Sequence, residues 1–264
     1  MSPLVAAARP GFDAPGADIF DTPCIGGTFN LFGSEACVNR VIIYMFLAAA
    51  IVIVFFVVAS RQSGLVPRGA RALAESIVEF IREQIVMQAI GPDGLRWVPF
   101  LTAMFSFILV GNLFGIIPGI QFPVNSRMAI PGTLAMVVWV MFNAVGVKEQ
   151  GLKYFKGVLF PPGVPKGFYL LLTPIEAASV FLLRPFTLSV RLLANMMAGH
   201  LLLSVFFLGS AYLLGNPISI PFALPAFALS VAFVAFEVLV AVLQAYIFTI
   251  LTAVYIAGAM HPEH

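Results

Sequence analysis

The chain has 264 residues, of which 61% are apolar and only 10% are charged, and its formal net charge is +2. An average soluble domain carries about 25% charged residues, and a soluble fold of this length could not cover so much apolar surface. The small net charge gives no indication of nucleic-acid binding. The composition therefore predicts an integral membrane protein built of apolar helices, since a bilayer removes the need for a polar surface.

Residues 1–40 are rich in Gly, Pro and Asp, which predicts an extracytoplasmic segment with little regular structure. Cys24 and Cys37 both lie in it. A disulfide is one interpretation if this segment is outside the cytoplasm, and two unpaired thiols are the other. No Cys/His spacing typical of a metal site occurs, so neither a metal nor another cofactor is predicted. The remainder, 41–264, is expected to form a single polytopic membrane domain.

The first membrane span is predicted over 41–59, a run of about 20 uncharged residues. The segment 66–91 differs, because its apolar residues recur at helical spacing while charged residues occupy the other face: Glu75, Glu79, Arg82 and Glu83. This pattern predicts an amphipathic helix that lies at the membrane interface rather than crossing it.

A second span is predicted over 98–117 and a shorter third over 132–147, with a Pro/Gly turn region between them. A polar loop containing four lysines is expected over 148–169. Two much longer apolar stretches follow, at 173–214 and 220–260. The segment GNPISIP at 215–221, which contains Pro217 and Pro221, marks the break between them.

The long stretches exceed what a perpendicular crossing requires. A helix over 173–214 would extend about 63 Å, whereas the hydrocarbon core is about 30 Å thick. No polar loop divides either stretch. Three interpretations remain: each stretch is two short helices, has a large extramembrane part, or is one strongly tilted helix. The missing polar loop favours strong tilt, and Pro185 is expected to bend the first stretch.

Basic residues orient the chain by the positive-inside rule. Five arginines lie between the first and second spans, and the four lysines lie before the first long stretch. Both loops are therefore expected in the cytoplasm, which places the N-terminus outside and the C-terminus inside.

Arg191 is the most informative single residue, because it lies far from either end of its apolar stretch. A charge at the bilayer centre costs about 3 kcal/mol on insertion scales. Since arginine stays protonated, it cannot relay protons, but it can attract a passing carboxylate and block proton leakage. Small residues near it, Ala194, Ala198 and Ser204, either admit a helix of another chain or pack within this one.

Four further polar residues lie in the long stretches. Asn195 is one helical turn beyond Arg191, on the same face. Glu237 and Gln244 are seven residues apart and share a face of the second stretch. His200 is a candidate relay, because an imidazole titrates near neutral pH, although a lone histidine is more often a packing residue. Intramembrane acids usually line proton or ion paths, so Glu237 is the strongest candidate for one.

Glu176 has two interpretations. Thr173-Pro174-Ile175-Glu176 matches a capping box with proline at the first helical position, so Glu176 would only start the helix. A place at a proton exit near the cytoplasm is the alternative.

The segments SVRLLANMMAGHLLL and LQAYIFTILTAVYI, with NLFGIIPG at 112–119, resemble subunit a of the F-type ATP synthase. In the best-known bacterial pattern of this family, an acid stands at the position of His200 and a histidine at that of Glu237. Here the two residue types are exchanged, as in the mitochondrial branch. The resemblance implies two aqueous half-channels beside a ring of c subunits, with Arg191 as the essential barrier between them. It also assigns Asn195, His200, Glu237 and Gln244 to polar channel positions, and it implies that the last two helices form a strongly tilted hairpin around the ring.

The resemblance further implies a multi-pass protein of the bacterial inner membrane that is not an enzyme by itself. Its partners would be the c-subunit ring, the b/b′ peripheral-stalk subunits, the rest of the F1Fo complex and membrane lipids. A self-contained proton-coupled transporter is the alternative, although the internal repeats usual in that class are not visible. An intramembrane enzyme would need a catalytic cluster, which the sequence lacks.

Overall fold

The computed structural model describes residues 16, 28–31, 34–37, 39–61, 67–117, 124–151, 153–160, 168–215 and 220–260. Among these residues, five helices are long and apolar enough to cross a membrane, which confirms the predicted all-α membrane protein. A short antiparallel hairpin, β1 (Thr28–Leu31) with β2 (Ser34–Cys37), precedes them in a segment where the sequence predicts little regular structure. Cys24 lies outside the described residues, so the disulfide stays a prediction.

The first span is α1 (Arg40–Arg61). It begins after the buried Asn39, whose Oδ1 accepts a hydrogen bond from the backbone N–H of Ile42 at 3.1 Å. This contact supplies one of the first-turn N–H groups with an acceptor. Most of α1 is exposed, as expected for a helix at the edge of the bundle whose apolar side chains contact lipid.

The amphipathic segment forms one helical unit with a change of pitch. It comprises α2 (Ala70–Phe80), a π-helical turn (Ile81–Val86) and α3 (Met87–Ala89). Ile81 and Ile85 are fully buried, whereas ion pairs among the charged residues lie on the exposed side: Arg71–Glu75, Arg82–Glu79 and Arg82–Glu83. The two-faced pattern predicted for this segment is therefore present, although Leu73 of the apolar face is itself exposed.

The centre of the bundle is formed by α4 (Val98–Leu113) and α5 (Ala129–Gln150), against which the long C-terminal helices pack. The helix α4 follows a 3-10 turn, Pro92–Trp97, and ends four residues before the predicted boundary at 117. The helix α5 is longer at both ends than the predicted span 132–147. Pro131 does not interrupt it because a proline in the first turn sacrifices no intrahelical hydrogen bond.

The predicted loop 148–169 is partly wrong, because α6 (Lys153–Leu159) lies within it. Gly151, at φ 63°, ends α5 and reverses the chain, a conformation that glycine adopts without steric cost. The ring of the buried Tyr154 then packs directly on the backbone of Gly146. Lys166 lies outside the described residues.

Gly146→Ala is expected to destabilise the bundle by about 1–3 kcal/mol, the usual range for overpacking. An added Cβ would lie 2.5 Å from ring atoms of Tyr154, which is buried and cannot yield cheaply. Gly132→Ala on the same helix is the matched control, because its added Cβ meets nothing within 4 Å. Thermal unfolding in detergent measures both variants. Equal midpoints would contradict this packing.

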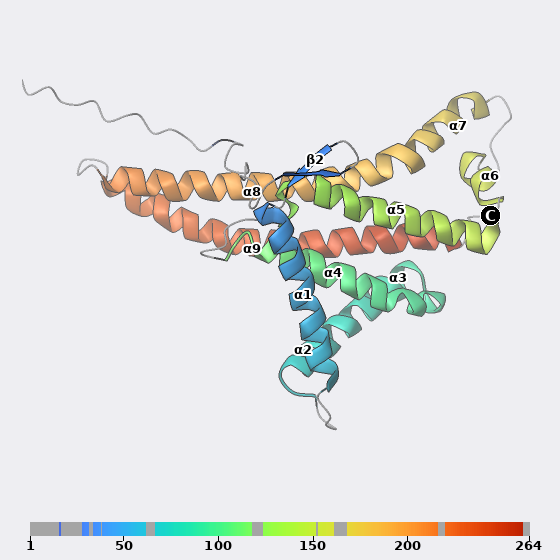
Figure 1. The fold of residues 1–264 in the computed structure, drawn as a ribbon, viewed down its shortest axis with the longest axis horizontal. Coiled ribbons are helices and arrows are strands. Elements are labelled where there is room, and N and C mark those ends of the chain that lie inside the picture. The colour runs from blue at the N-terminus through green and yellow to red at the C-terminus, as the bar shows by residue number, and fades with distance from the viewer. Residues whose placement is uncertain are drawn as a thin grey trace, which may run out of the picture.

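The first long stretch is continuous but changes pitch. It consists of α7 (Tyr169–Ala178), a π-helical turn (Ser179–Leu183) and α8 (Arg184–Leu214). In a π-helical turn, a carbonyl accepts a hydrogen bond from the N–H five residues later. For Val180 that residue is Pro185, which has no N–H. Instead, Trp139 Nε1 of α5 donates to the Val180 carbonyl at 3.3 Å. Figure 1 shows α7 rising away from the line of α8, which agrees with the predicted bend at Pro185.

The predicted capping box at Thr173 is wrong. The helix already begins at Tyr169 and contains Pro174 in its interior. The apolar residues before Thr173 continue the helix, and the Thr173 hydroxyl donates to the carbonyl of Leu159 in α6 at 3.1 Å. Glu176 therefore does not start this helix.

The last helix, α9 (Ile220–Met260), has 41 residues and would extend about 62 Å. Figure 1 shows α8 and α9 side by side along the long axis of the molecule, with α1 running across them. The helix α1 has the length of a single bilayer crossing. The hairpin of α8 and α9 is steeply inclined to α1, which agrees with the predicted tilt of the two long helices.

Candidate functional site at the contact of α8 and α9

One face of α8 carries Arg191 together with small and polar residues. Arg191, Ala194, Asn195 and Ala198 are all exposed and recur at helical spacing. Among the described residues, Arg191 has no ion-pair or hydrogen-bond partner. The cation thus lies on the outer surface of the chain, beside positions where a second helix could approach closely.

Asn195 connects this face to α9. Its Nδ2 donates to Oε1 of Gln244 at 2.5 Å, and Gln244 is almost fully buried. The Nε2 of Gln244 has no hydrogen-bond partner among the described residues. A buried amide normally finds partners in protein or water, so this position suits a bound water molecule between the two helices.

Glu237 faces α8 and is 6% exposed. Its carboxylate approaches the backbone of Gly199, because a Cβ added there would lie 3.0 Å from Oε1. Its other oxygen, Oε2, has no hydrogen-bond partner among the described residues. Glu237 and Asn195 also line the same cavity, of about 300 Å³, which is large enough for several water molecules.

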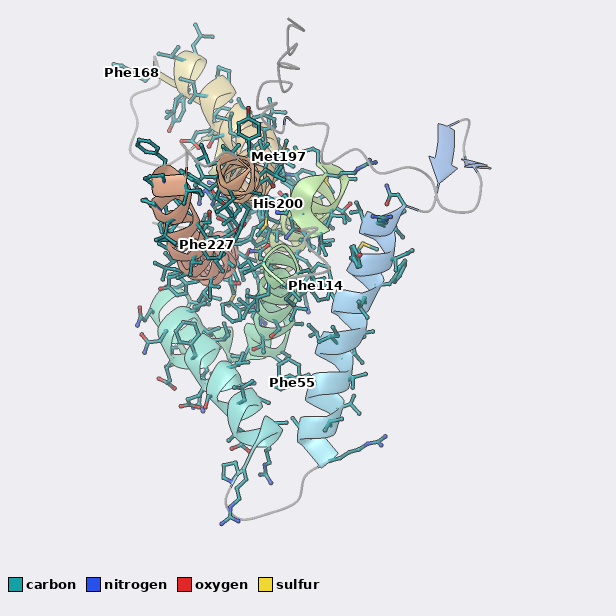
Figure 2. The ribbon with its side chains drawn as sticks, turned by 90° about the vertical axis from the view of Figure 1, so that its left-hand side faces the viewer. Phe55, Phe114, Phe168, Met197, His200 and Phe227 are labelled. Carbon is teal, nitrogen blue, oxygen red and sulfur yellow. The ribbon has the colours of Figure 1, made fainter. Side chains whose placement is uncertain are left out.

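His200 lies at a neighbouring cavity of about 590 Å³, whose walls include Ile116, Ser204 and Val234. Figure 2 looks along α8 and α9 and shows His200 between α8 and the green helices of the central bundle. Leu203 lines both cavities. The structure therefore brings His200 and Glu237 to adjoining spaces, and direct contact between them stays a prediction.

The structure also contains a buried pair of hydrogen-bonded amide side chains that was not predicted from the sequence. Asn125 Nδ2 donates to Asn112 Oδ1 at 2.7 Å, and Asn112 Nδ2 donates to the backbone carbonyl of Ala241 at 3.4 Å. Both asparagines are almost fully buried. Asn112 is visible in the sequence as a polar residue within a span, but Asn125 lies in a Pro/Gly-rich turn region that gives no such signal. Together they extend the buried polar groups from α9 to α4.

Glu176 is not part of this group. It lies on α7, half-buried, fifteen residues before Arg191, or about 22 Å along a helix. Between them Arg184 places its guanidinium 5.1 Å from the ring centre of Tyr255 and 6.0 Å from that of Phe142. Within the described ranges, no three His, Cys, Asp or Glu side chains gather as a metal site.

Gly199→Ala is expected to stabilise the protein less than Gly258→Ala does, because the added methyl group would lie 3.0 Å from Oε1 of Glu237. Helix propensity alone would make each change stabilising by about 1 kcal/mol. Gly258→Ala on α9 is the control, since its Cβ meets nothing within 4 Å. Thermal unfolding in detergent measures both variants, and equal unfolding midpoints would contradict the contact.

The described residues contain five apolar helices long enough to cross a membrane. The two longest enclose carboxyl, amide and imidazole groups and expose Arg191. This combination is typical of polytopic membrane proteins that translocate ions. The family model described as ATP synthase A chain matches residues 42–257. The chain belongs to this family.

Relatives named ATP synthase subunit a match almost the whole chain. That of Frankia alni is 46% identical over 97% of this chain and 89% of the relative. That of Rhodococcus erythropolis is 40% identical over 98% of this chain and 94% of the relative. Membership makes the chain a multi-pass component of the Fo proton channel in the ATP synthase complex of the bacterial inner membrane, and not an enzyme by itself.

Proposed function

We propose that the chain forms two aqueous half-channels beside the c-subunit ring, and that Arg191 separates them. The observation that carries the proposal is the exposed face of α8, where Arg191, a cation without an ion-pair or hydrogen-bond partner among the described residues, lies beside Ala194 and Ala198. A charged residue of a membrane helix needs a counter-ion. A carboxylate on a passing c subunit fits that requirement.

In this mechanism, protons enter from the outer side along Glu237 and His200 and reach the ring carboxylate. The ring then carries each proton through almost a full turn. When the protonated carboxyl arrives at the second half-channel, Arg191 favours its ionised form, and the proton leaves toward the cytoplasm past Glu176. Each proton gains about 2.3 kcal/mol per 100 mV of membrane potential.

Asn195 and Gln244 support the barrier in this proposal. Their hydrogen bond joins the exposed face of α8 to a buried side chain of α9, so polar groups continue from the surface beside Arg191 into the contact between the two helices. The buried carboxyl and amide groups, with the two cavities beside them, would let water reach the ring from the outer side. The N-terminus is proposed outside, and the b/b′ subunits are proposed to hold the chain stationary.

Ala198→Trp tests the proposed ring-facing surface. The indole would project from the exposed face of α8 and is expected to reduce ATP synthesis more than ten-fold, with less c-ring retained on gentle solubilisation. Ala50→Trp, at an exposed position of α1, is the matched control and is expected to have little effect. Purification with full c-ring and unchanged synthesis for Ala198→Trp would exclude this face as the contact. An unaltered chain that purifies without any ring would favour a self-contained transporter.

A further inference from the structure

A separate cavity of about 260 Å³ lies at the charged end of α4 and α5. The 3-10 turn before α4 contributes Arg96 and Trp97, and the last turns of α5 contribute Met141, Ala144, Lys148 and Glu149. Neither α8 nor α9 lines it. The cavity is therefore distinct from the candidate proton path.

The lengths of the two spans place the cavity where the hydrocarbon region is expected to meet the headgroups. The candidate span Pro92–Leu113 begins at this end, and α5 finishes here; each has 22 residues. Such a helix is about 33 Å long, close to the hydrocarbon thickness of about 30 Å. The charged residues at this end therefore reach the interface, while Met141 and Ala144 lie one to two turns deeper.

The charges of the cavity favour an anion. Arg96 Nη2 pairs with Glu149 Oε1 at 2.7 Å, and the Arg96 guanidinium lies 5.7 Å from the ring centre of Trp97. Arginine has five N–H donors, so most of them stay available after this pair forms. Lys148 is exposed and has no ion-pair or hydrogen-bond partner among the described residues. The lining thus carries one net positive charge beside an apolar wall.

We propose that this cavity binds an anionic phospholipid. Its phosphate contacts Lys148 and the remaining N–H donors of Arg96, and an acyl chain runs along Met141 and Ala144. The pair with Glu149 fixes the position of the guanidinium, which presents planar donors to phosphate oxygens. Trp97 lies at headgroup level, where tryptophan is enriched in membrane proteins. The site would anchor the stationary chain to its lipid next to the moving ring.

The test uses the intact complex in lipid nanodiscs of phosphatidylcholine that contain a minor fraction of photoactivatable phosphatidylglycerol. Mass spectrometry after illumination is expected to find the lipid on the α5 peptide that contains Met141 and Ala144. Lys148→Gln is expected to reduce labelling about five-fold, the usual effect of one basic residue near an anionic lipid surface. Arg96→Lys, which retains the charge and loses the planar donors, is expected to reduce it less.

Lys153→Gln is the matched control, because this lysine is exposed on α6 and does not line the cavity; its labelling should be unchanged. Equal labelling by a phosphatidylcholine probe, or no change in both cavity variants, would overturn the proposal. Competition by soluble glycerol phosphate would indicate a free phosphate site. Labelling of another subunit in place of the α5 peptide would show that the lipid does not occupy this cavity and would also overturn the proposal.

Discussion

Arg191→Ala is expected to abolish ATP-driven proton pumping in inverted membrane vesicles, with a loss of at least 100-fold. The substitution removes the cation that is proposed to ionise the ring carboxylate and to separate the half-channels. Because Arg191 is exposed and has no partner among the described residues, its removal leaves no buried group of this chain unpaired. The expected loss therefore reflects function rather than folding. Acidification of the vesicle lumen, followed with a pH-sensitive dye, measures it.

Two further variants sharpen this expectation. Arg191→Lys preserves the charge but not the planar fork of donors, and we expect it to remain strongly impaired. Arg61→Ala removes a cation at the end of α1 and serves as the control, with pumping near that of the unaltered protein. A passive proton leak in Arg191→Ala that is blocked when the ring is removed would support the barrier. Unaltered ATP-driven pumping would refute the proposed role.

Glu237→Gln is expected to reduce proton transport by one to two orders of magnitude. Glutamine has nearly the same shape and fits the space beside Gly199, but it cannot release or accept a proton as the carboxyl group does. Packing of α8 on α9 should therefore persist, and thermal unfolding should change little. The same vesicle assay measures the loss, and transport close to that of the unaltered protein would exclude Glu237 from the path.

The double exchange His200→Glu with Glu237→His tests whether the two groups act as a pair. They line adjoining cavities that share Leu203, so an acid and an imidazole in swapped positions would still supply both groups to the same pair of cavities. We expect each single exchange to be impaired and the double exchange to recover a substantial part of the activity. Independent losses that add in free energy would show that the residues do not act together.

Several elements could be predicted from the sequence because their cause is local. Apolar runs of about 20 residues indicated the spans, and helical spacing of charges indicated the amphipathic segment over Ala70–Ala89. The length of 220–260 without a polar break indicated an inclined helix. The helix starts predicted near Pro131 and Pro174 were wrong, because a proline in a sequence usually indicates a helix boundary. A proline is nevertheless tolerated in or near the first turns of a helix when neighbouring groups hydrogen-bond to the backbone groups that it leaves free.

Contacts between distant segments were decided only by the tertiary structure. The sequence alone assigned a cost to Arg191, because a charge among apolar residues is unfavourable wherever the helix lies in the bilayer. It could not indicate that Arg191 is exposed, that Asn195 reaches Gln244, or that Gly199 gives room to Glu237. Those facts depend on how α8 is rotated against α9. That rotation is set by the packing of many side chains, whereas the cost of a charge in an apolar helix belongs to the residue itself.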